Sequence, residues 1–275
     1  MGDNYACCES CSCWLFKKKL VIDGRMLEFE MRFSTYIFDF DGTLVDSMPC
    51  WSQKMINILD RSGVSYPKDI IKIITPLGDV GTARYFKDVL KVNLSIEEMM
   101  RQMDEYALPE YRDRIILKPG VFDYLCKLKS NKCSLNVLTA SPHKMLDPCL
   151  KRNGIFDLFD HVWSCDDFGM TKSDKVIYFE AADKIGVKTN ETVFFDDNVN
   201  AVATAASAGM YTVGVFDKSG EDFTAQLKEI SDLYVDSFVG LEQMVYDLAY
   251  GSLVWRLLGH GKVFWRETFS RKMIS

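Results

Sequence analysis

Residues 36–47 read YIFDFDGTLVDS, an apolar run followed at once by carboxylates and a glycine. The apolar run, Tyr36-Ile37-Phe38, is typical of a strand that is buried on both faces of a parallel sheet. Asp39 and Asp41 stand at its carboxyl end, which is where ligands bind in open α/β sheets. This stretch therefore predicts a buried strand that delivers two carboxylates to a ligand site.

Apolar runs alternate with helical patterns through most of the chain. Further strands are expected at residues 135–138, 192–195, 211–215 and 233–235, and another begins at His161. Helices are expected at residues 121–129, 144–153, 175–185 and 199–208, and Gly154, Gly186 and Gly209 stand where C-caps belong. This alternation predicts an α/β fold with a doubly wound parallel sheet.

One long segment, residues 47–117, breaks the alternation. It contains no convincing strand, and its helical patterns at residues 51–61, 80–92 and 96–111 are punctuated by Pro67, Pro76 and Pro109. We therefore expect an α-helical cap domain at residues 47–117. The cap is inserted into a catalytic core that comprises residues 31–46 and 118–250.

The two ends of the chain differ in composition from the core. Residues 1–30 form an appendage that contains Cys7, Cys8, Cys11 and Cys13, and residues 251–275 form a basic, aromatic tail. The cysteines include one Cys-x-x-Cys but no second pair, so a reduced, flexible tail is favoured over a zinc site. Metal binding or lipid attachment there stays open. Because Lys17–Lys19 interrupt the apolar patch, no secretory signal is indicated, and a cytoplasmic location is expected.

The composition restricts the partners. The chain has 275 residues and a net charge of −6, which argues against a mainly nucleic-acid-binding protein. No apolar run approaches the roughly 18 residues needed for a membrane span. A small metabolite is therefore the expected partner. A monomer is compatible with the sequence, which does not determine the oligomeric state.

Polar residues also follow the later strands. Thr139-Ala140-Ser141 comes after the second strand, Asp196-Asp197 after another, and Lys172 and Lys175 occupy a loop before a helix. Clustered carboxylates call for a cation, and oxygen ligands favour Mg²⁺ over zinc. A carboxylate can also act as a nucleophile on phosphorus, while lysine and hydroxyl groups suit the phosphoryl oxygens. The set indicates phosphoryl-transfer chemistry.

These segments resemble the four motifs of the haloacid dehalogenase (HAD) superfamily, in the right order. Residues 39–47 resemble the first motif, residues 138–141 the second, Lys172 the third and residues 194–198 the fourth. The resemblance covers roughly residues 36–239. The helical insertion is similar to the cap of the phosphoglycolate phosphatase and β-phosphoglucomutase branch. The resemblance implies a HAD-like Rossmannoid core and a Mg²⁺-dependent phosphatase that hydrolyses a small phosphomonoester through an aspartyl-phosphate.

The resemblance also implies a role for each site residue. Asp39 is the nucleophile and Asp41 the general acid and base, while Thr139 and Lys172 bind phosphoryl oxygens. The residues implied to bind substrate are Gly42, Thr43, Ala140 and Ser141. The implied Mg²⁺ ligands are Asp39, the Asp41 carbonyl and Asp197, with Asp196 acting through water. Lys175 is a rival for Lys172, because Ser173 stands where relatives often have proline.

Several alternatives stay open at this point. A phosphosugar mutase of the β-phosphoglucomutase type would use the same motifs, and a non-catalytic phospho-acceptor or binding protein would be built on the same fold. Taken singly, Asp39 and Asp41 could be turn residues, Thr139 or Ser141 could cap a helix, and Lys172 could be a solvated loop lysine. The agreement of four motifs favours the catalytic interpretation.

Overall fold

A computed structural model describes residues 17–22, 25–30 and 33–241. The chain divides into one unit of residues 1–33 with 243–275 and a second unit of residues 34–242. In the first unit, β1 (Lys17–Ile22) and β2 (Arg25–Glu30) pair as an antiparallel hairpin, where the sequence suggested only an appendage. The cysteine cluster and the expected tail at residues 251–275 lie outside the described residues.

The second unit is built on a parallel sheet with the strand order β5-β4-β3-β6-β7-β8. The strands are β3 (Thr35–Phe38), β4 (Ser134–Thr139), β5 (His161–Ser164), β6 (Thr192–Asp196), β7 (Tyr211–Val215) and β8 (Leu233–Val235). The central strand β3 pairs with both β4 and β6, and the later strands are added on either side of it. The doubly wound fold predicted from the sequence is confirmed.

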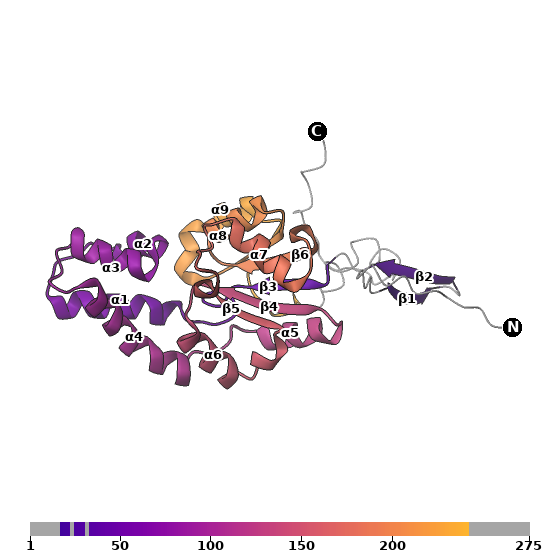
Figure 1. The fold of residues 1–275 in the computed structure, drawn as a ribbon, viewed down its shortest axis with the longest axis horizontal. Helices are drawn as coiled ribbons and strands as arrows, with labels where there is room; N and C mark the ends of the chain where they lie inside the picture. Colours follow the sequence, from indigo (N-terminus) through magenta and orange to yellow (C-terminus); the bar gives the residue numbers. More distant parts are fainter. Residues whose placement is uncertain (1–16, 23–24, 31–32, 242–275) are drawn as a thin grey trace. The chain divides into compact units, whose positions relative to one another are not determined.

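Helices cover both faces of this sheet (Figure 1). The core helices are α5 (Val121–Ser130), α6 (His143–Arg152), α7 (Val176–Ile185), α8 (Val199–Ser207) and α9 (Thr224–Ile230). On one face, Ile37 and Phe194 pack against the small residues Ala181 of α7 and Ala205 of α8. On the other face, the ring of Tyr124 in α5 contacts Phe38 and Phe195. Both faces of the central strands are therefore apolar, as the continuous apolar runs predicted.

The remaining helices follow β3 and form the cap, which has an apolar core of its own. They are α1 (Met48–Ser62), α2 (Ile70–Ile74), α3 (Gly78–Asp88) and α4 (Ile96–Asp113), and Figure 1 shows them grouped together. The sequence pattern did not indicate α2. Pro109 lies inside α4 rather than at its end, because burial of Tyr111 against Phe40 favours continuation of the helix beyond the proline.

Two adjacent segments join the cap to the core. Val45 forms bridges with both Asp41 and Leu117, and the Lys118 N–H donates to the Leu44 carbonyl at 2.9 Å. The outgoing and returning chains are thus hydrogen-bonded to each other beside the end of β3. The bounds 47–117 for the cap domain stay a prediction. Among the described residues, no helix is both long and apolar enough to cross a membrane.

Candidate active site

The predicted site residues meet where three neighbouring strands end. Asp39 follows β3, Thr139 ends β4 and Asp196 ends β6. The Asp39 N–H donates to the Phe195 carbonyl at 2.8 Å, which continues the β3–β6 pairing up to the first carboxylate. Because the strands are parallel and in register, three separate sequence segments deliver polar groups to one edge.

Lys172 is the lysine that lies at this edge. Its Nζ is 2.6 Å from Asp39 Oδ1 and 2.7 Å from Asp196 Oδ2, and its side chain is 13% exposed. Lys175 is exposed, and its Nζ lies 5.6 Å above the Phe179 ring. The geometry therefore brings Lys172, and not its rival, into contact with the carboxylates.

Three carboxylates form a cluster that can hold a cation. One oxygen each from Asp39, Asp196 and Asp197 lies within 4.8 Å of the others. Burial raises the pKa of Asp39 to about 7; Lys172 lowers that pKa, and Asp196 and Asp41 raise it further. Burial also raises the pKa of Asp197 well above its usual range, as do its acidic neighbours. These carboxylates lack sufficient positive charge nearby, so a divalent cation with oxygen ligands fits them.

The turn at Gly42 brings the backbone against this cluster. Gly42 has a φ of +74°, and a Cβ at this position would lie 2.5 Å from Asp197 Oδ2. Glycine is needed here for both conformation and space. The next residue, Thr43, was predicted to bind substrate; it is fully buried, and its Oγ1 donates to Asp197 Oδ1 at 3.3 Å.

Asp41 is held by three hydroxyl groups. Ser47 Oγ donates to its Oδ1 at 2.7 Å, Tyr111 Oη donates to the same oxygen at 2.6 Å, and Ser141 Oγ donates to Oδ2. Tyr111 belongs to α4, so one of the three hydroxyls comes from a helix of the cap. Ser141, which was predicted to bind substrate, contacts Asp41 in this arrangement.

The structure also decides the capping alternatives. Thr139 Oγ1 accepts from the Ser141 N–H at 3.1 Å, whereas α6 begins after Pro142 without a side-chain cap. Thr139 and Ser141 are therefore not helix caps. The side chain of Asn198 caps α8. Ala140, predicted to bind substrate, is exposed at the end of β4.

Three residues at the site received no role from the sequence. Ser47 and Tyr111 bind Asp41, and Lys118 Nζ donates to the Gly42 and Phe216 carbonyls and to Asp217. Ser47 ends the first motif and Lys118 begins the return from the cap, so both stood in recognised segments. Tyr111 carried no comparable signal, because a tyrosine at an apolar helix position is usually a packing residue.

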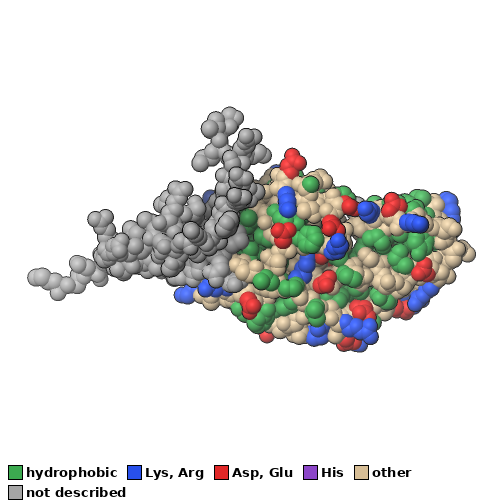
Figure 2. All heavy atoms as spheres, turned by 180° about the vertical axis from the view of Figure 1, so that it is seen from behind, with side chains coloured by type: hydrophobic (Ala, Val, Ile, Leu, Met, Phe, Trp, Pro, Cys, Tyr) green, Lys and Arg blue, Asp and Glu red, His purple; other side chains and the backbone are tan. Residues whose placement is uncertain are grey.

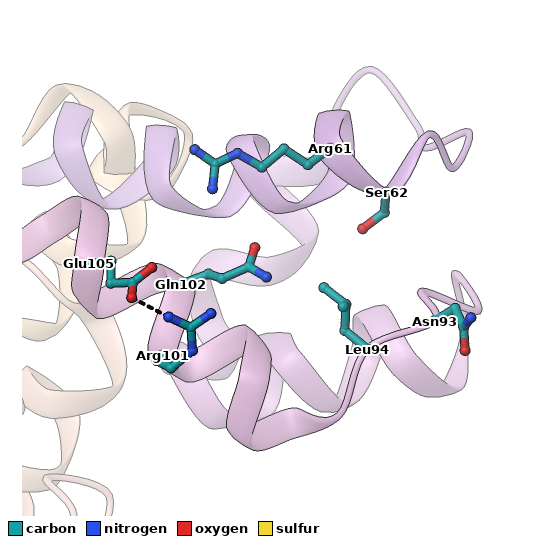
Figure 3. A pocket seen from close by; sticks show the side chains of 7 residues that line it. All are labelled: Arg61, Ser62, Asn93, Leu94, Arg101, Gln102 and Glu105. Atoms are coloured by element: carbon teal, nitrogen blue, oxygen red, sulfur yellow. Dashed lines mark hydrogen bonds and ion pairs between the residues drawn. The ribbon is translucent and has the colours of Figure 1, made fainter.

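A hollow of about 420 Å³ lies elsewhere, in the cap between α1 and α4 (Figure 3). Arg61 and Gln102 line it, and Arg101 pairs with Glu105 there. None of its lining residues belongs to the carboxylate cluster. On the face shown in Figure 2, acidic and basic side chains are interspersed over the described surface, which shows no extended basic area there.

The comparisons with known proteins agree with this geometry. Residues 33–209 match the family model described as haloacid dehalogenase-like hydrolase. This chain belongs to that family. It is 25% identical to the phosphorylated carbohydrates phosphatase of Thermotoga maritima over 174 residues, which cover 63% of this chain and 81% of the relative. It is 26% identical to hexitol phosphatase B of Escherichia coli K12 over 185 residues, which cover 65% and 82%.

A solved structure confirms the fold of this hydrolase. CbbY from Rhodobacter sphaeroides, crystallised with phosphate, superimposes with a TM-score of 0.64 at 22% identity. The match covers 76% of this chain and 96% of the other. The family model confirms the resemblance to the haloacid dehalogenase superfamily that was drawn from the motifs.

Proposed function

We propose that the chain is a Mg²⁺-dependent phosphatase that hydrolyses a small phosphomonoester through an aspartyl-phosphate. The observation that carries the proposal is the contact between Lys172 and Asp39 beside two further carboxylates, with Asp41 held two residues away. This arrangement provides Asp39 as a nucleophile, the Lys172 ammonium for the phosphoryl oxygens and Asp41 as an acid–base group. Phosphatase names among the relatives support the same chemistry.

Asp39 acts as the nucleophile. A carboxylate oxygen attacks phosphorus, the bond between phosphorus and the ester oxygen breaks, and an acyl phosphate forms on Asp39. Lys172 binds one of its oxygens, Oδ1, at 2.6 Å, which leaves Oδ2 to attack. The same lysine neutralises charge on the phosphoryl oxygens, and the Thr139 hydroxyl at the end of β4 binds them.

Asp41 transfers the proton in both half-reactions. It protonates the leaving alcohol as the ester bond breaks, and then takes a proton from the water that attacks the acyl phosphate. The second step releases inorganic phosphate and restores the Asp39 carboxylate. The hydroxyls of Ser47, Tyr111 and Ser141 fix the orientation of Asp41 for these transfers.

Mg²⁺ fits the carboxylate cluster. Asp39, Asp197 and the Asp41 carbonyl would hold it, and Asp196, which also binds Lys172, would act through water. When bound, the ion supplies charge stabilisation at the phosphoryl oxygens. The elevated pKa of Asp39 and Asp197 supports this assignment, because a bound cation favours their charged forms.

The substrate that we propose is a small phosphorylated metabolite. Two relatives are named for phosphorylated carbohydrates and hexitol phosphates, which places sugar and polyol phosphates among the candidates. The cytoplasmic location stays a prediction from the sequence, which is compatible with a monomer but does not determine the oligomeric state.

The decisive variant for this proposal is Asp39→Asn, which removes the nucleophile at nearly constant volume. Hydrolysis of p-nitrophenyl phosphate with Mg²⁺ should fall by about 1,000-fold or more. Asp46→Asn, at an exposed carboxylate of the same motif, is the matched control and should keep its activity. Full activity of Asp39→Asn would contradict the nucleophile assignment. With hexose 1-phosphates, release of phosphate rather than isomerisation would separate a phosphatase from a mutase.

A further inference from the structure

The cap contains a buried ion pair outside the catalytic cluster. Lys54 of α1 places Nζ 2.6 Å from Asp79 Oδ2 of α3, and the Lys54 side chain is only 4% exposed. The Trp51 indole N–H donates to Asp79 Oδ1 at 2.9 Å. Both oxygens of Asp79 are thus fixed, while its side chain keeps 30% exposure.

The two helices that this pair connects are also joined by apolar packing. Met55 and Ile58 of α1 already share an apolar cluster with Ala83 and Phe86 of α3. Burying an ammonium group costs free energy, and the attraction to a single carboxylate rarely offsets that cost in full. The ammonium has three N–H groups, and Asp79 is its one recorded acceptor within the described part of the chain. The other two N–H groups have no acceptor among the described residues, so they can donate to a ligand that reaches them.

The pair lies on the face of α1 that is directed at the catalytic carboxylates. Ser47, Cys50, Trp51 and Lys54 follow the spacing i, i+3, i+4, i+7, which places them on one side of a helix. Ser47 donates to Asp41, so this side faces the site. The Cys50 thiol, whose pKa burial raises to about 12, is close enough to Asp41, Lys54 and Asp79 to interact electrostatically with each. Seven residues separate Ser47 from Lys54, or about 10 Å along the helix.

We infer that Asp79 and Lys54 bind hydroxyl groups of the substrate, at the end remote from its phosphate, and so select a sugar or polyol phosphate. This inference rests on the proposed phosphatase activity. The carboxylate accepts hydrogen bonds from hydroxyls, and the ammonium donates to them. Because the pair is neutral overall, it gains little from a second anionic group. A hydroxylated chain is therefore preferred over one that ends in a carboxylate.

Three phosphate esters of matched length test the inference. Glucitol 6-phosphate carries hydroxyls, n-hexyl phosphate lacks them, and 6-phosphogluconate replaces the terminal alcohol with a carboxylate. The wild type should show the highest kcat/KM with glucitol 6-phosphate. In Asp79→Asn, the preference for glucitol 6-phosphate over hexyl phosphate should fall by about 10-fold or more. Relative activity on 6-phosphogluconate should rise, because Lys54 then lacks its carboxylate partner.

Two further variants complete the experiment. Trp51→Phe keeps an aromatic side chain but loses the N–H that fixes Asp79, together with part of the ring. It should lower the same preference by a smaller factor, so the test survives if Asp79→Asn does not fold. Asp88→Asn, an exposed carboxylate at the end of α3, is the matched control and should leave all three ratios unchanged.

The outcomes separate this inference from the proposed function. If the wild type hydrolyses the esters and neither variant alters the ratios, the inference is wrong while the phosphatase proposal stands. Equal loss on all three esters would assign the pair a structural role and also overturn it. If the wild type hydrolyses no phosphate ester, the proposed function falls and this inference falls with it.

Discussion

At the scale of single residues, Asp39 lies in surroundings that oppose its charge. Burial and the neighbouring carboxylates raise its pKa to about 7, although Lys172 is in direct contact with it. A nucleophile must be ionised, so in the proposed mechanism a cation at the cluster would have two effects: it would keep Asp39 charged and it would neutralise the phosphoryl group. The chemistry and the stability of the protein are therefore linked through the same carboxylates.

Asp39→Asn should stabilise the protein in the absence of metal. The carboxyl pKa rises from 3.8 in the unfolded chain to about 7 in the folded one. The free energy of unfolding of the wild type therefore falls as the pH rises from about 4 to 7, because the unfolded state releases the proton first. Asparagine removes this dependence. Thermal unfolding in EDTA should show a higher Tm for the variant at pH 8 and a smaller difference at pH 5.

Mg²⁺ provides the complementary measurement on these two proteins. Added Mg²⁺ should raise the Tm of the wild type and of the Asp46→Asn control, because it binds only the folded cluster. Asp39→Asn should respond less, since it has lost one ligand. Equal Mg²⁺ responses in all three would argue against Asp39 as a ligand.

Lys172→Met should reduce kcat/KM by roughly 100-fold or more, because the variant loses a preorganised charge beside the phosphoryl oxygens. Lys175→Met removes an exposed lysine three residues further along and should stay within about twofold of the wild type. Steady-state hydrolysis of p-nitrophenyl phosphate compares the two. A greater loss in Lys175→Met would reverse the assignment.

The sequence predicted Asp39, Asp41 and Asp197 as site residues because each lies in a short motif after a predicted strand. It predicted Lys172 from the third motif, in a loop before a helix. It did not identify Tyr111, whose contact with Asp41 spans 70 positions of the chain. No local pattern encodes that contact. It depends on where the final turn of α4 meets the core, which only the three-dimensional arrangement reveals.

At the scale of elements, the turn after β3 joins the sheet, the carboxylate cluster and the cap. Gly42 lets the backbone pass within contact distance of Asp197, and its carbonyl accepts a hydrogen bond from Lys118. Lys118 also binds Asp217 at 2.9 Å, so the chain returning from the cap is tied to the loop after β7. An Asp-Gly pair indicated a turn here, but not the close approach to Asp197.

Gly42→Ala should therefore lower the free energy of unfolding by more than an alanine in the left-handed region usually does. Gly63→Ala is the matched control, because Gly63 has a φ of +65° and open space where a Cβ would lie. The control should lose about 1–2 kcal/mol of unfolding free energy. Gly42→Ala should lose more and should also weaken Mg²⁺ binding, as followed by denaturant unfolding and calorimetric titration. Equal effects of the two variants would contradict the proposed close packing.

The start of α6 should show a pH-dependent stabilisation. His143 contacts Asp147 through Nδ1 and Asp167 through Nε2, each at 2.8 Å, and these hydrogen bonds raise its pKa. The stabilisation is complete below the unfolded pKa near 6.5 and is lost as the pH rises through the higher folded pKa. His143→Gln should be less stable than the wild type at pH 5.5, by less than about 1 kcal/mol for this half-exposed site. The difference should shrink by pH 8.5, as measured by urea unfolding.

At the scale of the whole molecule, the alternation of apolar runs predicted the parallel sheet and the helical insertion correctly. Residues 36–38 and 192–195 are apolar on both faces because both are covered by helices, and that burial is visible in the sequence. The β1–β2 hairpin was missed, since its lysine-rich first strand lacks an alternating pattern. The contact between Lys54 and Asp79 was not predicted either, because the two residues come from different cap helices.

The account depends most on the covalent intermediate at Asp39. Rapid acid quench during turnover of a ³²P-labelled ester with Mg²⁺, followed by peptide mapping, tests it directly. The account predicts label on the peptide that contains Asp39, with loss of the label in Asp39→Asn and retention in Asp46→Asn. An unlabelled protein during active turnover, or label on a different residue, would contradict it.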